Sequence, residues 1–252
     1  MPNTKISRQP APSNTQEKLS KSAKGLRSRL AILDATLVCI AKHGLTGVTH
    51  RAIAAQAGVP HSLTTYFFKS LQDVKEQAFE RFVSLATEDN LKLMALAENY
   101  IDSCDPAERF VPARRQAQID VLTDMLSEFV VREGAEHAVG IAVELNVLYM
   151  YRTSGRLRQL ADDYRNMLVR RIAELIRKLA PERAQDADTD ASLVLAVLHK
   201  LELDCMNASL NPPRERVRRE ISRLLSVMFA VGERDHLAAR HADAAAVRST
   251  AA

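Results

Sequence analysis

Glycine and proline divide the N-terminal quarter of the chain into three short helical segments. Apolar residues recur at helical spacing in the first segment, which predicts a helix over residues 28–43. A second helix is expected over residues 50–57, where Gly58 ends it, and a third over residues 60–67. Three helices this short have to pack across one another to bury their apolar faces.

The remaining chain is patterned as long helices, without the alternation of apolar and polar residues expected of a strand. Helices are expected near residues 71–101, 107–132, 135–152, 156–180, 187–209 and 213–231. Residues that stop helices separate them, namely Asp105-Pro106, Gly134, Ser154-Gly155, Pro181 and Asn211-Pro212-Pro213. The alanine-rich tail, residues 233–252, is expected to fray. The sequence therefore predicts an all-α fold, with an N-terminal three-helix domain and a C-terminal helical bundle.

The positive charge is concentrated at the N-terminus. The formal net charge of +4 divides into +6 for residues 1–29, +2 for residues 30–70 and −4 for residues 71–252. Residues 1–25 are rich in Pro, Ser, Lys and Asn and lack periodic apolar positions, so we expect a disordered basic arm there. Such an arm beside a compact helical unit suits contact with a polyanion, and a solubilising tail is the alternative.

The second and third segments, with the glycine turn between them, have the layout of a helix-turn-helix motif, which places one helix in the DNA major groove. The residues of the motif are specific. It reads THRAIAAQAGVP over Thr49–Pro60 and TTYFFKSLQDV over Thr64–Val74, and it follows ILDA at 32–35 and a turn at Gly44. This resembles the N-terminal DNA-binding domain of the TetR family of bacterial transcriptional regulators. The resemblance covers residues 26–86, with the helix-turn-helix motif at about 49–68.

The resemblance implies which residues meet DNA. The third helix would present His61, Ser62, Leu63, Thr64 and Thr65 to the bases. The phosphate backbone would be held by Thr49, Arg51, Tyr66 and Lys69. The chemistry agrees, because threonine hydroxyls bond either type of base and threonine methyls pack on thymine. Ser62 stands where the family commonly has Gly, and Phe67 where it commonly has His or Tyr. These two departures are expected to change the affinity for DNA and the target sequence rather than DNA binding itself.

The apolar side chains of this domain are expected to form its core rather than a binding surface. Ile53, Val59 and Phe68 belong to this group, because a small three-helix unit needs them for its core. At the start of the second helix, Arg51 is the expected DNA contact and His50 is expected to be only solvated.

Residues 87–232 form a second domain, and the resemblance implies that it binds a ligand and forms a dimer. The candidate ligand residues are Phe82, Phe110, Met125, Phe129, Glu144, Asn146, Tyr149 and Met167. Residues of the apolar candidates' type and spacing are more often simple core than pocket lining. Glu144 and Asn146 either orient a ligand in an apolar cavity or meet Arg152 or Arg170 in a structural network.

The last two helices carry apolar stripes, which are Leu193, Val194, Val197, Leu198 and Leu201 on 187–209, and Ile221, Leu224, Leu225 and Met228 on 213–231. The resemblance implies that these helices pair with a second copy to form a homodimer. Two recognition helices then need half-sites about 34 Å apart, which predicts a palindromic double-stranded DNA operator. The resemblance implies a repressor that releases this operator when a small-molecule inducer binds. A dimeric DNA-binding or architectural protein that responds to no ligand is the alternative.

Other classes of protein lack support in the sequence. It shows no secretory h-region, no apolar run near 20 residues and no CxxC pair among its three cysteines. We therefore expect a cytoplasmic protein with reduced thiols and without a metal, a cofactor or a membrane partner. No nucleophile motif, phosphate loop or paired Glu-x-x-His motif indicates an enzyme. His199 with Glu202, and Glu133 with His137, are interpreted as surface ion pairs.

We expect the basic arm, Lys18–Arg29, to contact phosphates or the minor groove. Deletion of residues 1–26 should therefore flatten the dependence of DNA affinity on salt concentration, because fewer counterions are released on binding. Titration of DNA at several salt concentrations measures this slope. An unchanged slope would show that the arm makes no such contact.

Overall fold

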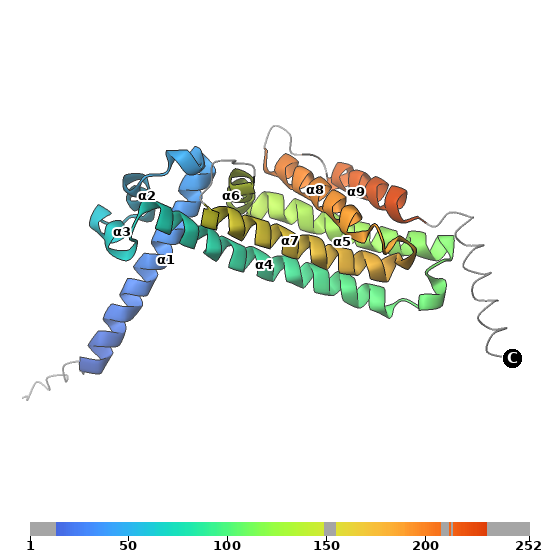
Figure 1. Cartoon of the computed structure of the whole chain (residues 1–252), viewed down its shortest axis with the longest axis horizontal. Coiled ribbons are helices and arrows are strands. Elements are labelled where there is room, and N and C mark those ends of the chain that lie inside the picture. The colour runs from blue at the N-terminus through green and yellow to red at the C-terminus, as the bar shows by residue number, and fades with distance from the viewer. Residues whose placement is uncertain (1–13, 149–154, 208–211, 213, 231–252) are drawn as a thin grey trace, which may run out of the picture. The chain divides into compact units, whose positions relative to one another are not determined.

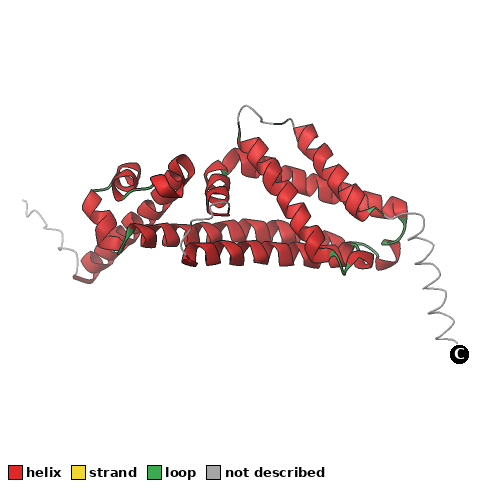
Figure 2. Cartoon of the chain, turned by 45° about the horizontal axis from the view of Figure 1, so that its top comes forward, coloured by secondary structure: helices red, strands yellow, loops and turns green. Residues whose placement is uncertain are grey.

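The regular elements of the described chain are all helical. A computed structural model describes residues 14–148, 155–207, 212 and 214–230, and Figures 1 and 2 show helices and no strand in this part. The helices are α1 (Asn14–Gly47), α2 (His50–Ala57), α3 (His61–Phe67), α4 (Leu71–Ser103), η1 (Pro106–Glu108), α5 (Pro112–Glu136), α6 (Ala138–Leu148), α7 (Gly155–Leu179), η2 (Pro181–Arg183), α8 (Ala187–Met206) and α9 (Arg214–Phe229). The predicted all-α fold is confirmed.

The chain forms two compact units, residues 1–78 and residues 79–252. We call them unit 1 and unit 2. The boundary falls inside α4, which begins in unit 1 and continues in unit 2. The sequence placed this boundary after residue 86, because an uninterrupted helix gives no local signal for the end of a domain.

Unit 1 has a small apolar core between α1, α2 and α3. α2 packs against both of the other helices. Ile32, Ile40 and Ile53 are completely buried and Phe68 is 2% exposed. The core roles predicted for Ile53 and Phe68 are therefore confirmed, whereas Val59 is only half-buried.

α1 begins earlier than the sequence predicted. It starts at Asn14, so residues 14–25, which we expected to be disordered, are helical. The reason is local, because this stretch consists mainly of good helix formers such as Gln, Glu, Lys, Leu and Ala and joins α1 without interruption. The prolines that suggested disorder lie within residues 1–13, outside the described residues. Near its other end α1 is kinked at Gly44, where φ is 67°.

One described stretch has the length and composition of a membrane-spanning helix. It lies within Ala23–Gly47 of α1 and has a mean hydropathy of 1.3. Ile32, Leu33 and Ile40 of this stretch are buried in unit 1. Their place in the core accounts for the hydropathy of α1.

Unit 2 is a helical bundle in which α5 packs against α8 and α9, and α7 packs against α8. The short α6 contacts α5, α7 and α8 (Figure 1). Ile119, Val130, Ala173, Leu201 and Ile221, which come from α5, α7, α8 and α9, are completely buried. These helices therefore share one apolar core.

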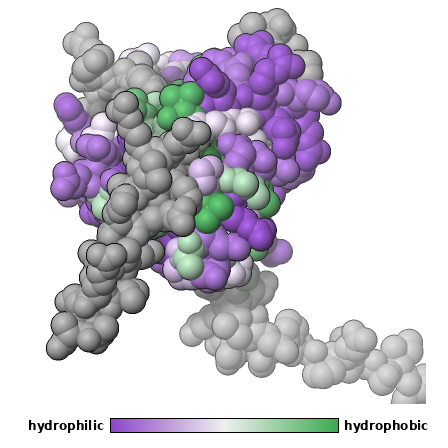
Figure 3. All heavy atoms as spheres, turned by 90° about the vertical axis from the view of Figure 1, so that its right-hand side faces the viewer, coloured by the Kyte–Doolittle hydropathy of each residue, from purple (hydrophilic) through white to green (hydrophobic). Residues whose placement is uncertain are grey.

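A buried arginine ties three elements of unit 2 together. Arg115 on α5 is completely buried, and its Nη1 donates to Glu182 Oε1 of η2 at 3.0 Å and to the Phe229 carbonyl of α9 at 3.1 Å. Many other ion pairs lie nearer the surface, such as Lys178 with Asp102 at 2.8 Å. The face drawn in Figure 3 is largely hydrophilic, with small apolar areas between the polar ones.

The apolar stripes predicted to pair with a second copy mostly face the core of their own chain. The buried members are Val194, Leu198, Leu201, Ile221 and Leu225. Leu193 and Leu203 of α8 are 54% and 38% exposed, and Val227 of α9 is 65% exposed. A second copy would therefore meet the exposed side chains rather than the whole stripes, because the buried ones already have partners.

Gly134 does not end a helix, contrary to prediction. α5 continues through it to Glu136, and α6 begins at Ala138. A Cβ atom at Gly134 would lie 2.3 Å from the Cβ of Cys205 on α8. Glycine is needed here because it lets the two helices approach closely. The predicted extension of α6 to residue 152 lies beyond the described residues.

Replacement of Gly134 by Ala should destabilise unit 2 by about 1–3 kcal/mol, because the added methyl group overlaps Cys205 and forces α5 and α8 apart. Urea-induced unfolding of the variant measures the loss. Gly155→Ala is the control, since a Cβ at Gly155 meets nothing within 4 Å, and its effect should stay within about 0.5 kcal/mol. Equal effects of the two substitutions would show that close approach is not the reason for Gly134.

Candidate functional site

α2 is fixed at both ends by its own sequence. Thr49 is its N-cap, and the Oγ1 atom of Thr49 accepts a hydrogen bond from the Ala52 N–H at 3.1 Å. Gly58 ends the helix with a left-handed φ of 64°, and its N–H bonds the Ala55 carbonyl at 3.3 Å. Pro60 then leads directly into α3. The turn between α2 and α3 is therefore encoded locally.

α3 presents a polar face to solvent. His61, Ser62 and Thr65 are exposed, and Tyr66 is 78% exposed. Thr65 Oγ1 donates to the Ser62 carbonyl at 3.1 Å, which leaves its lone pairs free to accept. Arg51 is exposed at the start of α2. Small polar groups beside a cation are the chemistry that base edges and phosphates require.

Thr64 does not belong to this exposed face, which corrects the prediction that it contacts bases. Its side chain is completely buried, and its Oγ1 donates to the His61 carbonyl at 2.8 Å. The reason is the register of the helix, because Thr64 lies one turn before the buried Phe68 and points inward with it. Thr65 carries the exposed threonine hydroxyl of α3.

Lys69 lies just before a capped helix start. Ser70 Oγ accepts from the Asp73 N–H at 3.0 Å, and Asp73 Oδ2 accepts from the Lys69 N–H at 2.9 Å. The pKa of Asp73 is lowered, mainly by the hydrogen bond from the Gln77 side chain. This reciprocal cap fixes the backbone of Lys69 while its side chain stays exposed.

His50 is not simply solvated, contrary to prediction. Its ring stands at 76° to that of His61, with 6.2 Å between the ring centres. The Nδ1 atom of His50 is buried without a hydrogen-bond partner. Burial, followed by the nearby His61, lowers the pKa of His50 and favours the neutral ring. Sequence reasoning missed this pair because it depends on how α2 and α3 meet.

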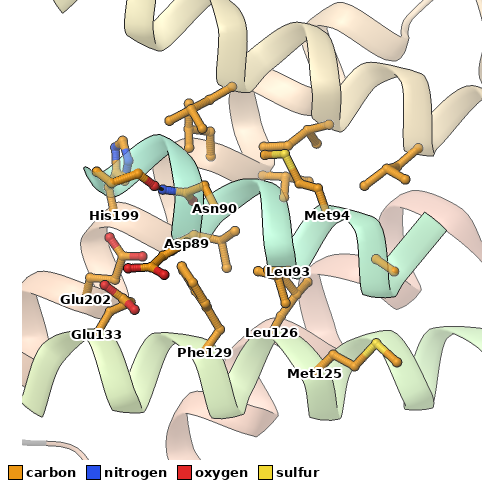
Figure 4. Close-up of a pocket in the computed structure, with 18 of the residues that line it drawn as sticks. Asp89, Asn90, Leu93, Met94, Met125, Leu126, Phe129, Glu133, His199 and Glu202 are labelled. Carbon is orange, nitrogen blue, oxygen red and sulfur yellow. Dashed lines mark hydrogen bonds between the residues drawn. The ribbon is translucent and has the colours of Figure 1, made fainter. Parts of the chain in front are cut away.

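Unit 2 contains a cavity of about 420 Å³ lined by residues of α4 to α9. Most of its lining is apolar. Figure 4 shows Leu93, Leu126 and Met125 along one part of it and carboxylates in another. The volume is within the range of pockets that hold small organic molecules, roughly 300–1,000 Å³.

The carboxylates of Asp89, Glu133, Glu144 and Glu202 line one part of the cavity, which we call the acidic end. Figure 4 shows Asp89, Glu133 and Glu202 pointing into the same space. Burial raises the pKa of Glu144 to about 7. Burial also raises the pKa of Glu202 well above its usual value, and the neighbouring Glu144 and Glu133 add to this shift. Both carboxyl groups thus hold protons more tightly than free glutamate does.

The imidazole of His199 does not neutralise the acidic end. His199 Nε2 lies 3.3 Å from Glu144 Oε1, without the geometry of a hydrogen bond. Burial, with a contribution from Arg165, lowers the pKa of His199 to about 4, so its ring is neutral at physiological pH.

The two pairs interpreted as surface ion pairs are partly wrong. Glu133 does pair with His137, with 2.7 Å between Oε2 and Nδ1, but Glu133 also lines the cavity. Glu202 is only 9% exposed and faces inward. The position of Glu202 along α8 could have indicated that it faces inward, because Leu198 and Cys205 lie on the same side of the helix and are also buried.

Metal binding has no structural support in the described ranges, where no group of three or more His, Cys, Asp or Glu side chains could hold an ion. The three cysteines are free, and Cys39 and Cys205 are buried.

Comparison with known families assigns unit 1. The sequence profile of the bacterial regulatory proteins of the tetR family matches residues 32–77, which span the helix-turn-helix described above. The match assigns this helix-turn-helix segment to the tetR family. A comparison with curated proteins gave no match.

Solved structures share the fold of this chain at low identity. A transcriptional regulator from Rhodococcus sp. Rha1 is 18% identical, with a TM-score of 0.56 over 79% of this chain and 94% of that one. A TetR-family member from Streptomyces coelicolor A3 is 22% identical, with a TM-score of 0.51 over 78% and 97% of the two chains. A proposed regulator from Saccharomonospora viridis in complex with choline is 20% identical, with a TM-score of 0.59 over 79% and 96%.

Half of the candidate ligand residues line the cavity of unit 2, namely Phe82, Met125, Phe129 and Glu144. The Asn146 amide instead donates to the Ala142 carbonyl of its own helix at 2.8 Å. Met167 packs against a neighbouring apolar cluster, and neither it nor Phe110 belongs to the lining. Tyr149 lies outside the described residues, as does Arg152, one of the two arginines considered as partners of Glu144.

Replacement of Glu144 by Gln should stabilise the ligand-free protein at neutral pH. The pKa of Glu144 is about 7 in the folded protein and 4.5 ordinarily, so the unfolded chain loses this proton at a lower pH. The wild-type protein therefore loses stability as the pH rises from about 4.5 to about 7. Glutamine cannot ionise, so the advantage of the variant should grow across this window, by at most on the order of 3 kcal/mol.

Urea-induced unfolding of both proteins at several pH values measures this difference. A difference that stays constant between pH 5 and pH 8 would contradict the raised pKa of Glu144.

Proposed function

We propose that this protein is a homodimeric transcriptional repressor of the cytoplasm, which binds a palindromic operator and releases it when a small molecule enters the cavity of unit 2. The observation that carries the proposal is the exposed polar face of α3 in a tetR-family helix-turn-helix domain. Tyr66, which is 78% exposed, adds an aromatic ring and a hydroxyl to this face.

The proposed DNA contacts fall into two groups, contacts to base edges and contacts to phosphates. His61, Ser62 and Thr65 would meet base edges, because they are exposed on α3 and carry small donors and acceptors. Arg51 and Tyr66 flank this face and would hold phosphates, together with Thr49 and Lys69. Thr49 Oγ1 accepts within the cap of α2, so its hydroxyl proton remains available for a phosphate oxygen.

A second copy would supply the second recognition helix. Leu193 and Leu203 on α8 and Val227 on α9 are exposed apolar side chains that a dimer would cover. Two copies related by a twofold axis match the symmetry of a palindrome, with half-sites about 34 Å apart.

α4 offers a physical link between ligand and DNA. It begins in unit 1 directly after Ser70, and its residues Phe82, Asn90 and Met94 line the cavity in unit 2. A ligand that prefers one position of α4 would shift the distance between the two recognition helices, with a coupling of typically 1–3 kcal/mol. The choline complex of the similar fold from Saccharomonospora viridis supports a small-molecule ligand.

Selection of bound duplexes from a random DNA pool should enrich a palindrome with the wild-type protein. Thr65→Ala should relax the base preference at one position in each half-site, because it removes an exposed hydroxyl. Thr64→Val keeps the shape of a buried side chain, so it should leave the base preference unchanged and cost about 1 kcal/mol of stability.

Arg51→Ala should weaken binding to all sequences and reduce the salt slope by about one phosphate contact. Lys92→Ala is the matched control, since it removes an equally exposed cation from unit 2. If no palindrome is enriched and only salt-sensitive binding remains, the alternative of an architectural protein that responds to no ligand replaces the proposal.

A further inference from the structure

We infer that the cavity of unit 2 takes an organic cation, a molecule with one ammonium-like head and an apolar body, which places its head between the carboxylates of the acidic end. The inference rests on the proposed function for the role of the cavity, and it adds the class of ligand. Its physical basis is the buried carboxyl groups of Glu144 and Glu202, which have no Lys or Arg ion pair among the described residues.

The acidic end is assembled from four different helices. Asp89 comes from α4, Glu133 from α5, Glu144 from α6 and Glu202 from α8. Figure 4 shows three of these carboxylates converging beside the ring of Phe129. Charges of one sign collected from four helices repel one another, so this arrangement costs stability unless a positive group enters between them.

The positive groups nearby compensate only part of this charge. Lys92 Nζ lies 3.1 Å from Asp89 Oδ1, and this carboxylate is 43% exposed. Arg132 lies 3.5 Å and His137 2.7 Å from Glu133, so these two side chains partner only that carboxylate. Arg165 on α7 acts on Glu144 and His199 through its charge, and we find no hydrogen bond or ion pair for it in the described part of the chain.

The remaining groups around Glu202 supply no cation. His199 lies one turn before it on α8 and holds a neutral ring, because burial depresses its pKa. Tyr164 on α7 is buried, and its pKa is raised by burial and by the surrounding carboxylates, so its hydroxyl stays protonated. Among the described residues no ion pair involves Glu202. This carboxyl is therefore the one most in need of a charged ligand.

Aromatic rings complete a cation site. The rings of Phe82 and Tyr164 meet edge to face, with 6.2 Å between their centres, and both line the cavity with Phe129. The guanidinium of Arg132 already lies 5.4 Å from the centre of the Phe129 ring, which shows that a cation is accepted there. Ring faces attract cations and hold quaternary ammonium groups that cannot donate hydrogen bonds.

The rest of the cavity selects an apolar body. Leu93, Met125 and Leu126 line the part away from the carboxylates (Figure 4). Methionine side chains adapt to ligands of different shape. A neutral ligand would fill this part but leave the carboxyl groups without partners, and an anion would add to the repulsion.

Cation binding should be coupled to proton release. Below about pH 7 Glu144 is protonated in the empty cavity, since its pKa is raised to about 7. A bound cation favours the carboxylate, so the Glu144 O–H bond breaks and the proton passes to solvent while the ammonium becomes the counterion. Affinity should therefore rise with pH through the pKa of the empty site and then level off.

Two isosteric probes test the inference by calorimetry. One is phenylpropyl-trimethylammonium, and the other is its neutral analogue with a tert-butyl group in place of the trimethylammonium. The cation should bind at least about tenfold more tightly than the neutral analogue. Its affinity should increase between about pH 6 and pH 8, whereas that of the neutral analogue should not.

Glu202→Gln and Glu144→Gln keep the shape of the site and remove one charge each. Each substitution should weaken binding of the cation by about tenfold and leave binding of the neutral analogue unchanged. Glu174→Gln is the control on α7, where the carboxylate is 51% exposed and pairs with Arg171 outside the cavity. Any of three results would overturn the inference. These are equal binding of the two probes, no binding of the cation up to millimolar concentration, and an equal loss of cation affinity in all three variants. The pH dependence in the wild-type protein tests it even if a variant fails to fold.

Operator release separates this inference from the proposed function. If the cation binds as expected but leaves operator affinity unchanged, the cation site stands and the ligand-responsive repressor fails. If only the neutral analogue binds and releases the operator, the repressor stands and the cation site is wrong.

Discussion

The close approach of α5 and α8 at Gly134 determines where the charges of unit 2 lie. Gly134 leaves room for Cys205, whose Cβ would stand 2.3 Å from any Cβ on the glycine. Glu133 is the neighbour of Gly134 in the chain, and Glu202 lies one turn before Cys205 on α8. The contact that closes the core therefore also brings two carboxylates toward one space. A larger residue at this crossing would separate the helices and the acidic end together.

Two kinds of buried charge in unit 2 differ in their partners. Arg115 is completely buried, and its Nε and Nη2 lack partners, but its Nη1 donates to Glu182 and to the Phe229 carbonyl, so it acts as a structural tie. Glu202 has no ion pair within the described residues, and Glu144 Oε1 is buried without a hydrogen bond. Burying a carboxyl group without a partner costs stability, and a protein that needed only a stable bundle would gain by replacing it. The difference favours a ligand site over a structural network.

The sequence predicts those features that are encoded locally. Thr49 and Gly58 bound α2 through contacts within a few residues, so the helix-turn-helix could be placed without the structure. Thr64 and Thr65 look equivalent in the sequence, and only the packing of α3 shows which hydroxyl is buried. Gly134 was misread as a break, because a glycine that ends a helix and one that admits a neighbouring helix have the same local pattern. Glu202 was missed for a similar reason, since its surroundings come from other helices.

The composition of α3 also bears on how readily DNA can be released. α3 carries no Arg or Lys, so the bidentate contacts to guanine that these side chains make are absent from its exposed face. Under the proposed function, discrimination would rest on small polar groups such as Ser62 and Thr65, and most of the affinity would come from phosphate contacts of residues such as Arg51. Phosphate contacts depend on register, because both halves of a dimer have to meet their half-sites together. A modest change in the separation of the two recognition helices would therefore be enough to lose the operator.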